Sequence, residues 1–351
     1  MIKSNENFNI GGSFEYQKDY CNSDFRGQFQ ALDNFSINGR SALYDILNEI
    51  IGKNIRTIYL PVFCCSSIIE CVKKSKLDII YYKLNSKLNP LVNPKKNTSI
   101  LVINYFGRIS KFVEKYKKSK SNKYILIEDA THSFLNIDFD PFVSSHYIYF
   151  SLRKHSHISA GGWSNASSQS KKKYIDNQML ISNLKLFRKK KKNFLNQNKY
   201  RENEDCFVNF FRKKEIELSK IYSTKNLSKS LKNEIYKYNW MDISKKRRNN
   251  WLLLDRLLGK KFKKIFKYLK KNEVPLGYII LVKERNKLRN YLKKRRIYSS
   301  IHWPIHKNIK KANFKFEVDL SNHILTIPID QRYSKNEIKY IADNIINSGI
   351  K

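Results

Sequence analysis

Several features that mark other classes of protein are missing from this sequence. No run of residues approaches the roughly 20 apolar positions that a membrane-spanning helix requires. Residues 1–7 are polar and lack the apolar stretch of a secretory signal peptide. The chain also has no internal repeats and no linker rich in glycine and serine. We therefore expect a globular cytoplasmic protein without a transmembrane segment.

Cysteine is sparse and arranged unfavourably for cross-links or metal binding. The chain has five cysteines, an odd number, and they show no paired spacing of the kind that metal ligands have. Cys64 and Cys65 are adjacent and would be poor partners for one disulfide. We expect no metal site, a reducing compartment, and thiols that behave as small buried apolar groups.

Acidic residues are also few. The 30 Asp and Glu stand against 69 Lys and Arg, which gives a net charge of +39. Such an excess can indicate binding to nucleic acid or to an anionic membrane. However, the lysines are accompanied by abundant Asn, Ile and Tyr, all favoured by AT-rich coding, and they are spread along the chain with peaks at 188–192 and 260–271. We do not expect a specific nucleic-acid ligand, and we favour a basic surface that attracts an anionic substrate or a membrane surface.

The hydrophobic pattern predicts an α/β protein. The length of 351 residues, with 41% hydrophobic residues, suits one large domain and a smaller one. Nearly continuous apolar runs, typical of strands buried on both faces, alternate with segments of helical periodicity. The expected strands are 57–63, 79–84, 99–105, 124–128 and 147–151, and the expected helices between them are 42–51, 67–75 and 109–118. This alternation predicts a mainly parallel sheet covered by helices.

The pattern changes after residue 170. Residues 170–246 are charged and helical in tendency, and a second α/β unit follows. There we expect helices at 250–258 and 285–294, strands at 275–282, 298–303 and 324–329, and a last helix that begins at a Ser334–Glu337 capping box and runs through 346. We accordingly divide the chain into a large domain, 1–246, and a small C-terminal domain, 247–351.

Three short segments carry candidate site residues. Asn38-Gly39-Arg40-Ser41-Ala42 precedes a predicted helix, whose free N–H groups and dipole suit a phosphate, although an ordinary N-cap with a turn glycine would look the same. Asp129 follows an apolar strand and should emerge at its carboxyl end, where it either binds a ligand or caps a nearby helix.

The third segment places Lys154 after the next apolar strand. A lysine at the rim of a buried pocket is a good nucleophile toward an aldehyde, whereas an isolated lysine is usually a solvated surface charge. A phosphate cradle, a carboxylate and a lysine at one edge of one sheet match the phosphate, ring nitrogen and aldehyde of pyridoxal 5'-phosphate.

At these segments the sequence resembles the DegT/DnrJ/EryC1/StrS sugar aminotransferases, which are pyridoxal-phosphate enzymes of fold type I. Residues 38–42 resemble the family's phosphate turn, and Glu128-Asp129-Ala130-Thr131-His132 resembles its acidic motif. Ser151-Leu152-Arg153-Lys154 is similar to the lysine motif of a divergent subgroup. Further similar runs are 10–15, 59–63, 302–304 and 325–333, so the resemblance spans most of the chain.

The resemblance implies an aspartate-aminotransferase-like fold and a role for each matching residue. Lys154 would hold the cofactor as a Schiff base and shuttle a proton, while Asp129 would pair with the pyridine nitrogen. His132 would lie near the 3-oxygen of the ring. The phosphate would be held by Gly39, Arg40, Ser41 and Ser151. The resemblance also implies a homodimer whose subunits complete each other's sites, with Asn239 and residues 182–183 as candidates.

Two departures from the family pattern bear on the site. Cys65 stands where the family has an aromatic residue over the cofactor ring, so either Phe63 or Tyr105 stacks there instead or the stacking is weaker. Ser159-Ala160-Gly161-Gly162 replaces the family's Gly-Glu-Gly-Gly, which bears on the choice of amino donor.

The leading hypothesis is therefore an aminotransferase. An amino acid such as glutamate would donate its amino group to a nucleotide-linked keto-sugar for the synthesis of a surface glycan. One alternative is a pyridoxal-phosphate-dependent sugar dehydratase; those relatives have histidine in place of the lysine, which Lys154 argues against, although His155 and His157 follow closely. The other alternative is a non-catalytic protein on the same fold: a cofactor-binding or basic regulatory protein, or a basic nucleic-acid binder.

Overall fold

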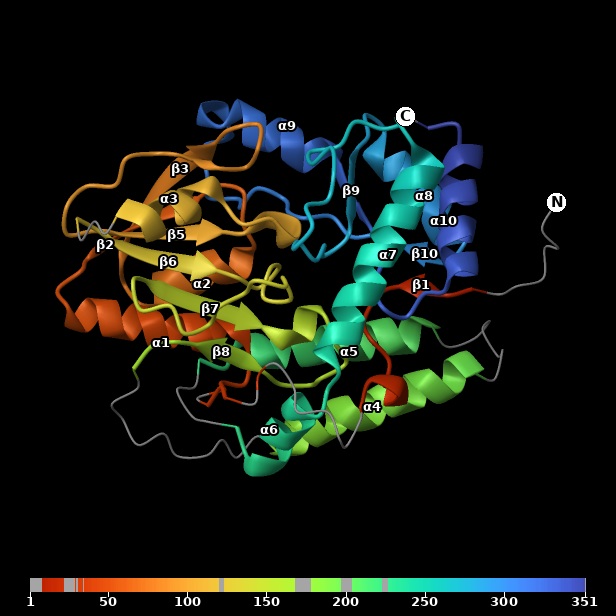
Figure 1. The fold of residues 1–351 in the computed structure, drawn as a ribbon, viewed down its shortest axis with the longest axis horizontal. Helices are drawn as coiled ribbons and strands as arrows, with labels where there is room; N and C mark the ends of the chain where they lie inside the picture. The colour runs from red at the N-terminus through yellow and green to blue at the C-terminus, as the bar shows by residue number, and fades with distance from the viewer. Residues whose placement is uncertain are drawn as a thin grey trace.

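A computed structural model describes residues 8–21, 29, 31–33, 35–119, 123–167, 178–196, 204–222 and 227–350. A seven-stranded sheet with the order β4-β3-β2-β5-β6-β7-β8 forms the centre of the molecule (Figure 1). Its parallel strands are β2 (Thr57–Pro61), β3 (Asp78–Leu84), β5 (Ser99–Ile103), β6 (Ile125–Asp129) and β7 (Tyr147–Ser151). The edge strands β4 (Pro90–Leu91) and β8 (Gly162–Ser164) pair antiparallel. The prediction of a mainly parallel sheet is confirmed.

Helices cover both faces of this sheet. The helices α1 (Gly39–Gly52) and α2 (Ser66–Lys74) pack on each other, and α1 also contacts β7 and β8. The helix α3 (Lys111–Ser119) contacts β6 and places Lys117 beside Glu128. Successive residues of a strand point to opposite faces, so Glu128 faces α3 and Asp129 faces the side of α1. Every residue of β5 is buried, as expected for a strand covered on both sides.

The described parts of the region expected to be helical, 170–246, contain three helices and the start of a fourth. These are α4 (Gln178–Asn196), α5 (Glu204–Ser219), α6 (Lys229–Tyr236) and α7 (Trp240–Leu258). The helix α7 is continuous across residues 246 and 247, so the expected domain boundary falls inside a helix. Within the described residues, no helix combines the length and the apolar character needed to cross a bilayer.

The C-terminal part packs around an antiparallel pair of strands, β9 (Tyr278–Leu281) and β11 (Ile324–Ile327). The other helices of this part are α8 (Arg285–Lys294), α9 (Lys315–His323) and α10 (Lys335–Asn347), and the Ser334–Glu337 capping box is present at the start of α10. The short strand β1 (Ile10–Gly11) pairs in parallel with β10 (Ile297–Tyr298), and Ile10 belongs to the same apolar cluster as Trp251 and Tyr278. The N-terminal strand therefore packs with the C-terminal part rather than with the large sheet.

Candidate active site

The predicted site residues meet at the carboxyl edge of the parallel sheet. Asp129 is the last residue of β6, and Ser151 is the last residue of β7. A single 3-10 turn, Leu152–Lys154, follows β7 directly, and α1 begins at Gly39 on the same edge. A cavity of about 130 Å³ lies between them, smaller than the roughly 300–1,000 Å³ of typical ligand pockets. The residues that line this cavity include Gly39, Arg40, Asp129, His132, Ser151 and Lys154.

Of the four residues predicted to hold the phosphate, only Ser41 does not line this cavity. Its hydroxyl donates to the carbonyl of Ile221 at 3.2 Å, and its backbone N–H donates to the side chain of Asn38 at 2.9 Å. Asn38 thus caps α1 in the manner expected for an N-cap residue.

Two glycines allow strands β7 and β8 to approach the start of α1. A Cβ atom on Gly39 would lie 3.0 Å from the Cβ of Ser151, and one on Gly162 would lie 2.1 Å from the carbonyl oxygen of Asn38. The amino end of α1 is therefore held directly against the end of β7. Because backbone N–H groups and the helix dipole are exposed there, this turn suits a phosphate group.

Asp129 is buried and held by two donors. Its carboxylate accepts from the backbone N–H of Thr131 at 2.9 Å and from the hydroxyl of Tyr149 at 2.7 Å. Burial raises the pKa of Asp129, while the two hydrogen bonds and the charge of Lys154 oppose this rise. A cation next to the carboxylate would stabilise its charged form.

An aromatic wall closes one side of the cavity. The ring of His132 packs against those of Phe106 and Trp303, with centroid distances of 5.8 and 5.5 Å, and the latter two rings also stack on each other at 6.2 Å. The Nδ1 of His132 accepts from the backbone N–H of Phe106. Burial, and then the charges of His302 and Lys154, lower the pKa of His132 well below its ordinary value. His132 is therefore neutral at physiological pH.

Phe63 and Tyr105, the residues suggested to stack on the cofactor ring, contact each other in the core next to the cavity. They stack on each other at a centroid distance of 5.8 Å, and the Tyr105 hydroxyl donates to the Phe63 carbonyl at 2.5 Å. This hydrogen bond keeps the Tyr105 ring in the core, and neither side chain lines the cavity. The rings that line it are those of His132, Tyr149, His302 and Trp303.

Lys154 is exposed at the rim of the cavity, and its charge shifts the pKa values of Asp129, His132 and His302. The two histidines that follow it lie elsewhere. His155 is buried with its Nε2 at 3.2 Å from the carbonyl of Thr131, and His157 contacts Tyr238. Neither histidine lines the cavity.

The lining residues that were not foreseen as site residues include three polar ones, Tyr149, Arg153 and Glu215. Tyr149 sits directly beside Asp129 in the register of β6 and β7, so an assigned strand register would have revealed it. Arg153 precedes Lys154 in the 3-10 turn, and Glu215 belongs to α5, which lies beyond the carboxyl end of β7 (Figure 1). No sequence pattern connects Glu215 with the sheet.

The residues expected to act across a dimer remain predictions. Asn239 caps α7, accepting from the backbone N–H of Asp242 at 3.1 Å, and residues 182–183 lie on α4.

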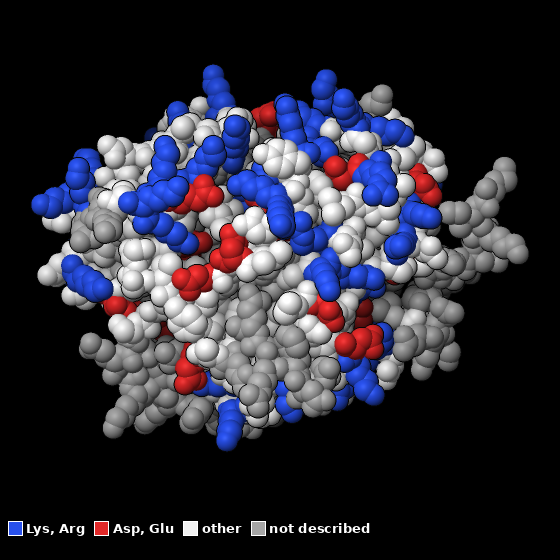
Figure 2. Space-filling model, viewed as in Figure 1, with Lys and Arg blue, Asp and Glu red and all other residues white. Residues whose placement is uncertain are grey.

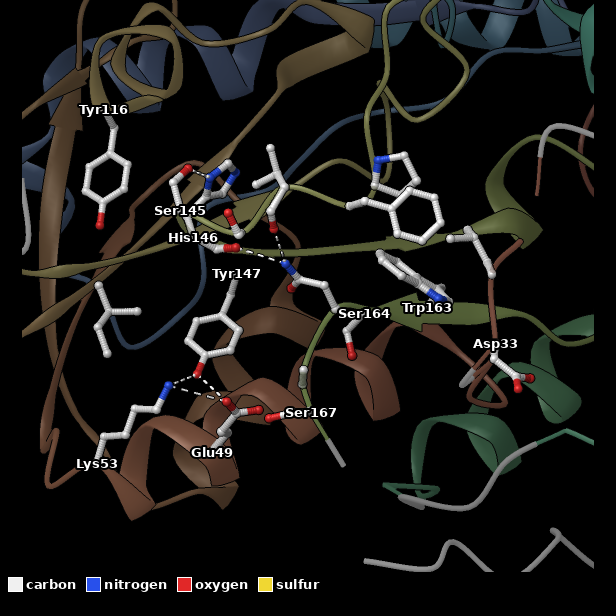
Figure 3. A pocket seen from close by; sticks show the side chains of 18 of the residues that line it. Asp33, Glu49, Lys53, Tyr116, Ser145, His146, Tyr147, Trp163, Ser164 and Ser167 are labelled. Carbon is white, nitrogen blue, oxygen red and sulfur yellow. Dashed lines mark hydrogen bonds and ion pairs between the residues drawn. The ribbon is translucent and has the colours of Figure 1, made fainter. Parts of the chain in front are cut away.

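A larger hollow lies at the opposite edge of the sheet. It has a volume of about 760 Å³ and is bordered by the starts of β6 and β7 and by the end of β8 (Figure 3). There the hydroxyl of Tyr147 donates to Glu49 and accepts from Lys53, both at 2.6 Å. This hollow contains none of the predicted site residues. Ligands of open α/β sheets bind at the carboxyl ends of the strands, so the smaller cavity is the better candidate.

The fold is that of the fold-type-I sugar aminotransferases of the DegT/DnrJ/EryC1/StrS type, as the sequence resemblance predicted. No protein-family model and no curated protein sequence matches the chain.

Solved structures provide the comparison. The chain is similar to Spr1654 from Streptococcus pneumoniae, assigned as a sugar aminotransferase, with a TM-score of 0.64 and 11% identity over 96% of this chain and 92% of that one. It is also similar to a DegT DnrJ EryC1 StrS aminotransferase from Brucella abortus, with a TM-score of 0.61 and 14% identity over 89% and 84% of the two chains. Spr1654 has been solved in apo, pyridoxamine-phosphate and pyridoxal-phosphate forms. At such low identity the similarity shows the fold alone.

Proposed function

We propose that the protein is a pyridoxal-phosphate-dependent aminotransferase that moves an amino group from an amino acid to a keto-sugar. The observation that carries this proposal is the meeting of Asp129, Lys154 and the amino end of α1 around one cavity. These groups come from segments far apart in the sequence, and each one suits a different part of a single cofactor.

The chemistry of the lining residues fits pyridoxal phosphate. At one end, the start of α1 offers backbone N–H groups beside the hydroxyl of Ser151, and the buried Nε of Arg40 has no hydrogen-bond partner in the described part of the chain. At the other end is the buried carboxylate of Asp129, which a protonated ring nitrogen would satisfy. Lys154 supplies the amine at the rim.

When bound, the cofactor supplies an aldehyde that condenses with amines and a ring that withdraws electrons from the substrate carbon. Asp129 keeps the ring nitrogen protonated, and Tyr149 and Thr131 hold the carboxylate in place for this task. Lys154 Nζ takes a proton from the substrate carbon and returns one during transfer. The wall of His132 and Trp303 shields this side of the site from water.

The same proposal includes the amino donor, the sugar acceptor, the oligomeric state, the location and the pathway. We propose glutamate as the donor, a nucleotide-linked keto-sugar as the acceptor, and a homodimer in the cytoplasm that serves surface-glycan synthesis. Figure 2 shows Lys and Arg side chains across the described surface of one face, with a dense group over α3 and the neighbouring strands. Such a surface attracts a diphosphate-bearing acceptor through long-range electrostatics.

A spectroscopic experiment with Lys154→Ala tests the proposal. The wild-type protein should develop an absorption band near the visible edge with pyridoxal phosphate, and borohydride should fix the cofactor covalently. The band should be absent from Lys154→Ala, because this variant lacks the amine that holds the aldehyde. Adding glutamate to the wild type should bleach the band. A wild-type protein that stays colourless would contradict the proposal.

A further inference from the structure

The phosphate end of the cavity contains more positive charge than the sequence resemblance implied. Arg40, Arg153 and Lys154 all line the cavity, and they come from the start of α1 and from the turn after β7. Within the described part of the chain, the Nε atoms of Arg40 and Arg153 are buried and lack hydrogen-bond partners. Buried guanidinium N–H groups favour an anion that can satisfy them.

A carboxylate of the protein already lies at this position. Glu215 of α5 lines the same cavity and forms an ion pair with Arg153. Desolvation opposes the ionisation of Glu215, but the charges of Arg153, Lys154 and Arg40 outweigh it and lower its pKa. The side chain of Glu215 is half exposed, whereas that of Arg153 is almost buried. The carboxylate therefore sits at the mouth of the anion site rather than in the core.

The end of α5 is fixed to the phosphate turn, close to Glu215. The side chain of Asn38 donates to the carbonyl of Leu218 at 3.0 Å, and the hydroxyl of Ser41 donates to the carbonyl of Ile221. Leu218 is fully buried. Glu215 precedes this anchor by about one helical turn, so a rotation of its exposed side chain can vacate the site while the helix end stays in place.

We propose that Glu215 is an internal competitor for the phosphate-binding end of the site: its carboxylate neutralises Arg153 in the unliganded protein and swings away when a phosphate group binds. This inference rests on the proposed function, because it takes the phosphate to be that of the cofactor. A phosphate carries about two negative charges at neutral pH and cannot share these cations with a carboxylate without repulsion. Glu215 thereby lowers the affinity for phosphate-bearing ligands and keeps the empty site from binding other anions.

Glu215→Gln tests this competition, with Glu217→Gln as the matched control. Glu217 lies on the same helix and pairs with Lys214, so this control makes the same charge change outside the cavity. Binding of inorganic phosphate, pyridoxal phosphate and phosphate-free pyridoxal is measured by calorimetric titration of the full-length apo-protein. We expect Glu215→Gln to bind phosphate and pyridoxal phosphate about tenfold more tightly than the wild type, and pyridoxal equally well. Glu217→Gln should match the wild type with all three ligands.

The three ligands separate this inference from the proposed function. Unchanged or weaker phosphate binding by Glu215→Gln would overturn the inference, even if the wild type binds pyridoxal phosphate and transaminates. An equal gain with pyridoxal would also overturn it, because the effect would then be structural and unrelated to the phosphate. If phosphate binding tightens but the wild type does not bind pyridoxal phosphate, the competition stands and the proposed function fails.

Discussion

At the scale of single residues, the site depends on how buried polar groups are satisfied. Asp129 has two protein donors, from Thr131 and Tyr149, and burial still raises its pKa. A positively charged partner would stabilise the ionised form of this buried carboxylate. The neutral His132 provides a flat stacked surface rather than a second charge.

Asp129→Asn separates binding of the cofactor from chemistry. Because the amide cannot keep a ring nitrogen protonated, we expect the variant to retain bound pyridoxal phosphate but to react with glutamate about 10²–10³-fold more slowly. Tyr149→Phe removes only one donor to the carboxylate and should slow the reaction by about tenfold. Stopped-flow absorbance after mixing with glutamate measures both rates. An unchanged rate for Asp129→Asn would exclude the role assigned to this carboxylate.

At the scale of secondary-structure elements, the sheet edge is shaped by the contact between β8 and the start of α1. Gly162 donates to and accepts from the backbone of Ser36 at 2.8 and 2.7 Å, which holds residues 36–39 against β8. A larger residue at 162 has no room, since its Cβ would meet the carbonyl of Asn38.

Gly162→Ala should therefore destabilise the protein and disturb the phosphate turn. We expect a loss of about 1–3 kcal/mol in the free energy of unfolding, because backbone must shift to accept the methyl group. Gly52→Ala at the end of α1 is the control, since a Cβ there meets nothing within 4 Å. It should be neutral or slightly stabilising. Urea denaturation followed by circular dichroism provides the comparison, and equal midpoints for the two variants would contradict the packing argument.

The central elements could be predicted from the sequence because their apolar runs are long. The five parallel strands lie within the predicted ranges or extend them by one residue, and α8 has the predicted bounds. Two-residue strands such as β1 and β10 have no period to detect, so their pairing was not predictable. The candidate site residues at strand ends, such as Asp129 and Ser151, could be placed at one edge of the sheet because the strands before them were predicted. Glu215 was not, because only the tertiary packing of α5 brings it to the cavity.

At the scale of the whole molecule, a buried cluster of ion pairs links the N-terminal segment to the C-terminal part. Glu15 pairs with Arg332 at 2.9 Å and lies 3.5 Å from Lys191 of α4, and Arg332 also binds Asp330. Burial opposes the charge of Glu15, but Arg332 and Lys191 outweigh it and lower its pKa to about 2. The ionised carboxylate therefore contributes to the stability of the fold.

Glu15→Gln should reduce stability in a pH-dependent way. The pKa of Glu15 is lower in the folded state than its ordinary value of 4.5, so its contribution is present above about pH 4.5 and is lost as the pH falls toward about 2. We expect a deficit of about 3 kcal/mol at pH 7, which shrinks below pH 4.5. Urea unfolding of both proteins at pH 7 and pH 3 measures it. A deficit that stays constant over this range would show that the carboxylate charge is not responsible.

The pairing of β1 with β10 also has a consequence for synthesis on the ribosome. Ile10 pairs with Ile297, and 297 − 10 = 287 residues separate them. At translation rates of about 5–20 residues per second, the first strand waits about 15–60 s before its partner is made. During that time Ile10 lacks the apolar cluster that later buries it. The nascent chain can therefore form its parallel sheet first. Strand β1, at the start of the chain, can pair only after β10 in the C-terminal part has been synthesised.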